Sequence, residues 1–444
     1  MYVLAKTNAT PAILLLLLSL VSVISKVSAE PMHTPTKMPM AKAESVGMST
    51  AGLARIDELM KEHIEAGHIQ GGVTVVARRG MVVHFSTHGE MDAAKGRAME
   101  TDAIFIMASS TKPVLGVAAM MMIEEGLMSP SDPVSKYIPE FADMKVAIPI
   151  ESAKKDVKAK DKGKSKEKGK GKGKGKGKDK VPAYRLVPVD TPVTIHHLLT
   201  HTSGLTGRGL ARGSIGRHTQ DDTLASYVPR LAQAPLDFQP GTQWGYSMGL
   251  DIVARVIEIV SKTPFDEFLR ERIFEPLEMN NTYFNIPSDK HSKRIVLTGI
   301  GAEKAKDWIK TTQYISASAG LSSIAEDFLH FEQMLLNGGE LFGHRLLSPA
   351  SVAMMSSNQV GDLYATTGKK PKGMAFGYTV GVTLDSKLAA DYRGSGAFGW
   401  RGAAGTVSWT DPENELVAVY LPLKPRDGGV SGVFEKAVMQ AIIK

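Results

Sequence analysis

The sequence predicts an α/β protein of the α+β type, in which helices flank an antiparallel β-sheet and a mostly helical subdomain is inserted. Two observations support this prediction. Strand patterns occur near both ends of the chain, whereas the long middle repeats apolar residues at helical spacing. We expect a sheet subdomain of about residues 45–108 and 315–444, a helical subdomain of about residues 109–314, and a ligand cleft between them.

The first elements after the leader are a helix and a hairpin. Ser49 can cap a helix with an apolar stripe that runs to about Gly67. Residues 73–78 and 81–86 are rich in β-branched residues and are joined at Arg79-Gly80, which predicts a β-hairpin. The sheet therefore begins before the helical middle.

The last elements are again strands. Leu250, Val253, Ala254 and Ile257 follow helical spacing in the middle of the chain, and Ser323 to Glu326 fits a capping box. A terminal helix is expected from about Val430. Four further segments alternate or run apolar between turn residues and are predicted as strands: residues 376–383, 396–400, 406–410 and 415–421.

The N-terminus has the organisation of a signal peptide. Lys6 precedes an uncharged apolar stretch over residues 12–24, and Val27-Ser28-Ala29 supplies small residues for cleavage. We expect residues 1–29 to be removed near Ala29 and residues 30–444 to be exported to the periplasm or the outside of the cell. An uncleaved anchor is the alternative, although the stretch is short for a bilayer.

Composition excludes several classes of site. The chain has no cysteine, so it has no disulfide framework, thiolate nucleophile or cysteine-bound metal. Its net charge of +7 comes from residues 154–180, where fourteen lysines face four acidic residues, and the rest is close to neutral. We expect no nucleic-acid partner. This lysine-rich insertion predicts disorder, either as a solvated loop or as a tether to anionic cell wall or membrane surface.

Ser109 and Lys112 form a Ser-x-x-Lys pattern at the head of an apolar helix that we expect to end near Gly126. Residues three apart share a helical face, and first-turn amides would point at the reacting group. A helix cap followed by a solvated lysine is the alternative. The buried helix and an extended lead-in over residues 101–107 favour a positioned nucleophile for acyl transfer.

Tyr246 lies in a turn-rich segment, residues 240–247, that enters a helix. It is either a general base or an amphipathic residue at the rim of the helical subdomain. A tyrosine has a pKa of about 10, so a base at neutral pH needs a nearby cation such as Lys112. Residues 399–405 combine small residues with one tryptophan before a strand, and either supply an oxyanion-hole amide or form a bulged edge.

Three histidines invite a metal interpretation that we do not adopt. His196, His197 and His201 are flanked by leucines and lack a His-Glu-x-x-His pattern, so capping or structural hydrogen bonds are expected. Asn280-Asn281-Thr282 is a glycosylation sequon that matters only in a eukaryotic secretory host.

These motifs, in this order, resemble the serine hydrolase family of class C β-lactamases, which also contains DD-peptidases, D-aminopeptidases and esterases. The motifs are Ser109 to Lys112, the His-His-Leu-Leu-Thr-His-Thr-Ser-Gly-Leu run at residues 196–205, the Tyr246 segment and residues 400–405. The resemblance extends from about Ser45 to the C-terminus, and it implies a β-lactamase/transpeptidase-like fold. It also implies that Ser109 is the acylated nucleophile, Lys112 its proton partner and Tyr246 the general base. The oxyanion hole would be the amides of Ser109 and Ala403.

Two departures from that family affect the expected substrate. Its Tyr-x-Asn is here Tyr246-Ser247-Met248, and its Lys-Thr-Gly is here Trp400-Arg401-Gly402. Methionine has no amide to donate, and tryptophan cannot pair a carboxylate. The tryptophan form resembles the esterase branch, although Arg401 would still offer a carboxylate two hydrogen bonds.

The hypothesis that follows is a secreted serine carboxylesterase acting on a small-molecule ester or amide without metal or cofactor. Met248, Trp400, Arg401 and Gly402 would contact the substrate. One alternative is a β-lactamase, DD-peptidase or D-amino-acid peptidase acting on the cell wall. The other is a non-catalytic wall-binding module that keeps a penicillin-recognising fold.

Overall fold

The computed structural model describes residues 36–150, 183–207, 209–210, 215–247, 249–296, 311–367, 371–424 and 429–443. The predicted signal peptide, the lysine-rich insertion at residues 154–180 and Met248 lie outside the described residues. Within these ranges, no helix combines the length and apolar character needed to cross a bilayer.

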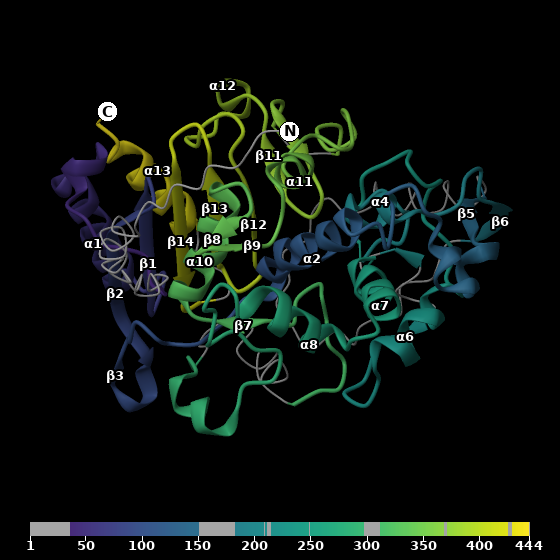
Figure 1. Cartoon of the computed structure of the whole chain (residues 1–444), viewed down its shortest axis with the longest axis horizontal. Helices are drawn as coiled ribbons and strands as arrows, with labels where there is room; N and C mark the ends of the chain where they lie inside the picture. Colours follow the sequence, from purple (N-terminus) through teal and green to yellow (C-terminus); the bar gives the residue numbers. More distant parts are fainter. Residues whose placement is uncertain are drawn as a thin grey trace, which may run out of the picture. The chain divides into compact units, whose positions relative to one another are not determined.

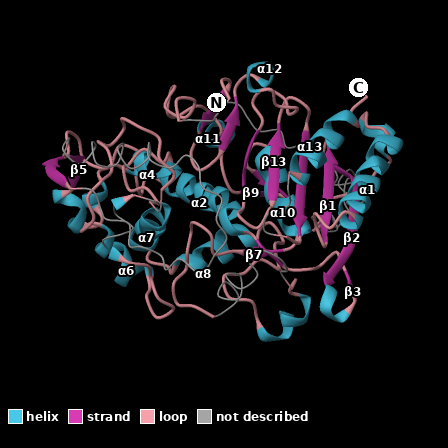
Figure 2. Ribbon diagram, turned by 180° about the vertical axis from the view of Figure 1, so that it is seen from behind, coloured by secondary structure: helices cyan, strands magenta, loops and turns pink. Residues whose placement is uncertain are grey.

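The main sheet is antiparallel and joins strands from both ends of the chain (Figures 1 and 2). Its central strand β1 is buried along its whole length, as its run of apolar and small residues predicts. It pairs with the hairpin strand β2 on one side and with β14 on the other. The eight strands, in spatial order, are β10 (Met374–Phe376), β11 (Gly381–Thr383), β12 (Phe398–Arg401), β13 (Val407–Asp411), β14 (Leu416–Pro422), β1 (Gly71–Arg78), β2 (Met81–Asp92) and β3 (Arg97–Ala98).

Helices cover both faces of this sheet. On one face, α1 (Thr50–Glu65) and α13 (Val430–Gln440) bury an apolar cluster that includes Val76, Trp409 and Tyr420. On the other face, α10 (Ala325–Leu336) packs against β13, β14 and β1. The side chains of β1 alternate between these two clusters, with Val75 in one and Val76 in the other.

The helical lobe is attached to the sheet through α2 (Lys112–Glu124), whose residues from Lys112 to Met122 are all buried. An all-round apolar helix is typical of a core element. It packs against α7 and against β12, and Figure 1 shows it between the sheet and the lobe. The other α-helices of the described residues are α4 (Ile195–Leu199), α6 (Leu224–Leu231), α7 (Leu250–Ser261), α8 (Phe265–Leu269), α11 (Pro349–Met355) and α12 (Ser386–Ala389).

Three two-stranded ladders complete the described fold: β4 (Phe105–Ile106) with β7 (Ser322–Ser323), β5 (Lys145–Pro149) with β6 (Tyr184–Pro188), and β8 (Glu340–Leu341) with β9 (His344–Arg345). The predicted antiparallel sheet with a helical insertion is confirmed. So are the Ser49 cap, whose side chain accepts from the Gly52 amide, and the hairpin turning at Arg79-Gly80.

Several local expectations were wrong. The segment 376–383 is not one strand, because Gly377 N–H donates to the Val380 carbonyl and closes a turn between β10 and β11. The capping box at Ser323 does not form. Ile324 occupies the cap position of α10, and the Ser323 hydroxyl instead bonds that of Thr282 at 2.7 Å. In the lead-in over residues 101–107, only β4 is a strand.

Candidate active site

Ser109 lies in a 3₁₀ turn, Ala108–Thr111, that joins β4 to α2. Ala108 has φ +46°, a left-handed conformation that is strained for a residue with a Cβ. Met107 holds the turn on its N-terminal side, because its N–H donates to the Leu321 carbonyl at 2.9 Å. This tertiary hydrogen bond helps to hold the backbone beside Ser109 in its strained conformation.

Two functional groups lie within hydrogen-bond distance of the Ser109 hydroxyl. Lys112 Nζ donates to Ser109 Oγ at 3.2 Å, and the Tyr246 hydroxyl lies 2.9 Å from the same oxygen. The Lys112 ammonium is 4.8 Å from the centre of the Tyr246 ring. Lys112 is only 2% exposed, whereas Tyr246 is 39% exposed. A hydroxyl with an oxygen and an amine at hydrogen-bond distance can exchange a proton with either group.

The buried Lys112 ammonium has a further partner that the sequence does not reveal. Nζ donates to the Ser318 carbonyl at 2.5 Å, and the Ser318 N–H donates to Asp251 Oδ1 at 2.9 Å. The Tyr314 hydroxyl donates to the other carboxylate oxygen of Asp251 at 2.8 Å. Burial and the neighbouring Asp251 raise the pKa of Tyr314, so its hydroxyl remains a donor. Asp251 thus fixes the loop that receives the lysine.

His201 holds the segment that carries Tyr246. Its carbonyl accepts from the Gly245 N–H at 2.8 Å, and its Nδ1 accepts from the Ser247 N–H at 3.3 Å. The two bonds flank Tyr246, and the rings of His201 and Tyr246 are 4.8 Å apart. Burial, and secondarily the charge of Lys112, lowers the pKa of His201 well below its usual value, so the ring is neutral.

The other two histidines of the motif have structural roles. His197 forms a capping box with Thr194 at the start of α4, and His196 Nδ1 lies 3.2 Å from the Tyr378 hydroxyl. Burial lowers the pKa of both imidazoles. These contacts agree with the expected capping and hydrogen-bonded roles of the histidine motif.

The expected oxyanion residues lie on two adjoining turns. The Thr406 hydroxyl is 2.9 Å from Ser110 Oγ and donates to the Met107 carbonyl at 3.1 Å, which links the β12–β13 turn to the turn that carries Ser109. Gly402 N–H donates to the Thr406 carbonyl at 2.8 Å. Ala403 follows in the same turn. Among the described residues, the amides of Ser109 and Ala403 have no acceptor, so both are available to a ligand.

Trp400 and Arg401 point away from each other, as neighbours on a strand do. The Trp400 ring is stacked on Tyr246 with centroids 5.9 Å apart, and its Nε1 lies 3.4 Å from the tyrosine hydroxyl. Arg401 instead pairs with Glu435 and donates to Ser431 Oγ at 2.9 Å, both on α13. The structure therefore places Trp400 beside Tyr246 and Ser109, while the Arg401 guanidinium is bound to α13.

A cavity of about 690 Å³ lies beside Ser109 and its two partners, Lys112 and Tyr246. Lys112, Tyr246, Asp251 and Ser318 contribute to its wall, together with residues of the helical lobe. A second cavity of about 520 Å³ lies along β12, with Trp400 and Arg401 in its wall. Trp400 therefore lines the second cavity and also contacts Tyr246, which lines the first cavity.

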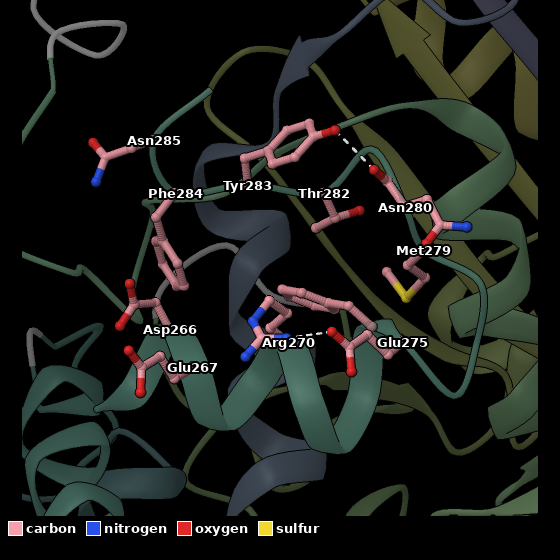
Figure 3. Close-up of a pocket in the computed structure, with 11 residues that line it drawn as sticks. Asp266, Glu267, Arg270, Glu275, Met279, Asn280, Thr282, Tyr283, Phe284 and Asn285 are labelled. Carbon is pink, nitrogen blue, oxygen red and sulfur yellow. Dashed lines mark hydrogen bonds and ion pairs between the residues drawn. The ribbon is translucent and has the colours of Figure 1, made fainter. Parts of the chain in front are cut away.

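A third pocket, of about 340 Å³, is separate from these groups (Figure 3). It lies beside the π-helical turn Arg270–Phe274. Arg270 pairs there with Glu275, and the Tyr283 hydroxyl donates to the Asn280 carbonyl at 2.7 Å. None of the residues around Ser109 lines this pocket.

The sequence and structure are similar to known hydrolases. The family model for beta-lactamase matches residues 56–427. Esterase EstB from Burkholderia gladioli is 26% identical over 422 residues, which cover 88% of this chain and 94% of EstB. Lovastatin esterase from Penicillium rubens is 26% identical over 400 residues, which cover 82% and 91%.

Among solved structures, EstCE1, described as a hydrolase with promiscuous acyltransferase activity, matches with a TM-score of 0.69 at 24% identity. The match covers 89% of this chain and 99% of EstCE1. The shared fold therefore includes both the sheet and the helical lobe.

Proposed function

Because this chain belongs to the beta-lactamase family of serine hydrolases, we propose that it is a carboxylesterase that forms an acyl-enzyme on Ser109. The observation that carries the proposal is the position of Trp400. At position 400, where the Lys-Thr-Gly motif of β-lactamases has a lysine, this chain has an indole that stacks on Tyr246, and the adjacent Arg401 is paired with Glu435. An uncharged ester fits such a surface better than a substrate that presents a carboxylate to it.

In the proposed reaction, Tyr246 starts as the tyrosinate, and its oxygen accepts the Ser109 proton as Oγ attacks the ester carbonyl. The Lys112 ammonium, within 4.8 Å of the ring centre, stabilises negative charge on the tyrosine. The carbonyl oxygen becomes an oxyanion that the amides of Ser109 and Ala403 can bind. The C–O bond to the alcohol then breaks, and the alcohol leaves with the proton held by Tyr246.

Deacylation repeats these steps with water. Tyr246 takes a proton from the water as the water oxygen attacks the acyl carbon, and the bond to Ser109 Oγ breaks. The proton returns to Oγ, and the free acid leaves. The exposed position of Tyr246 allows water to reach it, while the buried Lys112 remains fixed on the Ser318 carbonyl.

A second candidate activity, on β-lactams or D-Ala peptides, is favoured by one observation. Arg217 and His218 line the same cavity as Lys112 and Tyr246. Arg217 is exposed, and no ion pair joins it to another residue that the structure describes. A substrate carboxylate that reached Arg217 from the far side of the cavity would pair with it there.

Substrate comparison separates the two activities. The chain and its Ser109→Ala variant are assayed with p-nitrophenyl acetate, p-nitrophenyl butyrate and nitrocefin. Ester turnover that Ser109→Ala abolishes, with nitrocefin left intact, supports the esterase. Nitrocefin cleavage that exceeds ester turnover would replace it with the β-lactam activity. Inertness toward both, with no labelling by penicillin or a fluorophosphonate, would favour a non-catalytic wall-binding module.

We also propose that the chain is exported after cleavage near Ala29, and that the lysines of residues 154–180 attract anionic wall polymers or lipid headgroups. Deletion of residues 154–180 is then expected to leave ester hydrolysis intact and to weaken sedimentation with anionic vesicles. A large loss of turnover on deletion would contradict this separation of roles.

A further inference from the structure

Three side chains with metal-binding atoms converge on the sheet face that α1 covers. His84 and His88 are on β2, and their spacing of four places both on one face of the strand. Each Nε2 lies 2.8 Å from the hydroxyl of Thr74, which is on the neighbouring strand β1. Asp57 Oδ1, on α1, is 3.9 Å from each of these nitrogens.

A single ion would require the three ligand atoms to move closer together. The three ligand atoms all lie within 4.8 Å of one another. Tetrahedral zinc, with bonds of roughly 2.0–2.1 Å, holds its ligand atoms about 3.3–3.4 Å apart. The gap of 3.9 Å from Asp57 to each imidazole would therefore close by about half an ångström, and the gap between the two Nε2 atoms, which is at most 4.8 Å, by up to about 1.4 Å. Rotation of the Asp57 and histidine side chains would supply these movements.

Burial prepares the two histidines for this role. His84 and His88 are 7% and 8% exposed, whereas the Asp57 side chain is 48% exposed and leaves a path from solvent. Desolvation lowers the pKa of both imidazoles, that of His84 to about 4. A neutral imidazole has a lone pair for a metal.

The hydrogen bonds of Thr74 determine which ring nitrogen of each histidine carries a proton when no ion is bound. The Thr74 hydroxyl has one proton, so it can donate to only one of the two Nε2 atoms and must accept from the other. The two imidazoles therefore take opposite tautomers when only Thr74 joins them. An ion would take both Nε2 lone pairs and leave both Nδ1 atoms protonated, with the Thr74 oxygen or a water as the fourth ligand.

We propose that Asp57, His84 and His88 form a site for a divalent transition metal of the zinc class, which fastens α1 to the sheet. Two imidazoles and one carboxylate suit such ions better than calcium or magnesium. The site is structural, because β13 and β14 separate β1 from β12, the strand that borders Ser109 (Figure 1). The two histidines have His-x-x-x-His spacing in the sequence, but they lie on a strand and not on a helix.

Cobalt(II) serves as the probe, because its visible absorption reports coordination by nitrogen and oxygen ligands. The untagged full chain, first treated with a chelator, is titrated with cobalt and zinc, and its melting temperature is recorded in parallel. His63 provides the matched control, because it forms an exposed pair with His68, with Nδ1 atoms 2.8 Å apart. Asp57→Asn changes an exposed side chain and so avoids disruption of the core.

The expected result is one cobalt ion per chain, displaced by zinc, and a higher melting temperature with metal. Asp57→Asn should weaken binding at least tenfold and His88→Gln should abolish it, whereas His63→Gln should leave it unchanged. The melting temperature of metal-free Asp57→Asn should match that of the metal-free parent. The proposal is overturned if micromolar cobalt does not bind, if Asp57→Asn binds as well as the parent, or if His63→Gln removes the signal.

Discussion

The turn that carries Ala403 can be tested by adding one methyl group at Gly402. A Cβ at this position would lie 2.3 Å from the Met107 carbonyl oxygen and 2.2 Å from Thr406 Oγ1. Ordinary carbon contacts are about 3.5–4.0 Å, so the turn must move by roughly 1 Å. The Met107 carbonyl is a backbone group next to the turn that carries Ser109, and it cannot move aside as a flexible side chain can.

The displacement sets the expected magnitude. A shift of about 1 Å in a catalytic group lowers turnover about 10²-fold, and loss of an oxyanion donor about 10²–10³-fold. We therefore predict that Gly402→Ala lowers kcat/KM for p-nitrophenyl butyrate about 10²–10³-fold. Overpacking should cost about 1–3 kcal/mol of unfolding free energy, measured by denaturant titration.

Gly432 supplies the matched control for Gly402→Ala. It lies in α13, and a Cβ there would meet no atom within 4 Å. Gly432→Ala is expected to keep parental turnover and to gain up to about 1 kcal/mol of stability from helix propensity. Parental kcat/KM in Gly402→Ala, with the fold intact, would refute the placement of the oxyanion turn.

Three further changes probe the site and the core. Tyr246→Phe removes the oxygen 2.9 Å from Ser109 Oγ and should lower turnover about 10²–10⁴-fold with an unchanged melting temperature; near-parental turnover would exclude it as the base. The two carboxylate oxygens of Asp251 accept hydrogen bonds from the Tyr314 hydroxyl and the Ser318 N–H, and the amide of an asparagine cannot accept both. Asp251→Asn should therefore lower turnover about tenfold or more. An unchanged pH–rate profile with full kcat would contradict the link between Asp251 and Lys112. Burial raises the pKa of Glu332 to about 7 from its usual 4.5. As the pH rises, Glu332 therefore loses its proton in the unfolded state before it does in the folded state, and the free energy of unfolding should fall between about pH 4.5 and 7. Glu332→Gln should reduce that fall by up to about 3 kcal/mol in denaturant titrations at pH 5 and 7, and an identical pH slope in parent and variant would count against the buried neutral acid.

Local sequence signals predicted the elements whose determinants are local. The Ser49 cap, the turn at Arg79-Gly80 and the start of α13 near Val430 depend on neighbouring residues and appear as expected. The errors arise where a tertiary contact competes with the local signal. Ser323 has the right spacing for a capping box, yet its hydroxyl is used by Thr282, 41 residues away.

The candidate site divides in the same way. Ser109, Lys112 and Tyr246 are predicted from local motifs, and the fold brings the side chains of Lys112 and Tyr246 within hydrogen-bond distance of Ser109 Oγ. Asp251 and Ser318 were missed. Asp251 resembles an ordinary first-turn acid of a helix, and Ser318 acts through its carbonyl, which every residue possesses. No sequence pattern marks a backbone acceptor, so this part of the site required the structure.

Covalent labelling tests the central claim most directly. The chain, Ser109→Ala and Lys112→Ala are each treated with a fluorophosphonate, and intact-mass and peptide mass spectrometry locate the adduct. We predict one adduct per chain on Ser109, no adduct in Ser109→Ala, and much slower labelling in Lys112→Ala. An adduct on another serine, or equal labelling of Ser109→Ala and the parent, would contradict the assignment of Ser109 as the nucleophile.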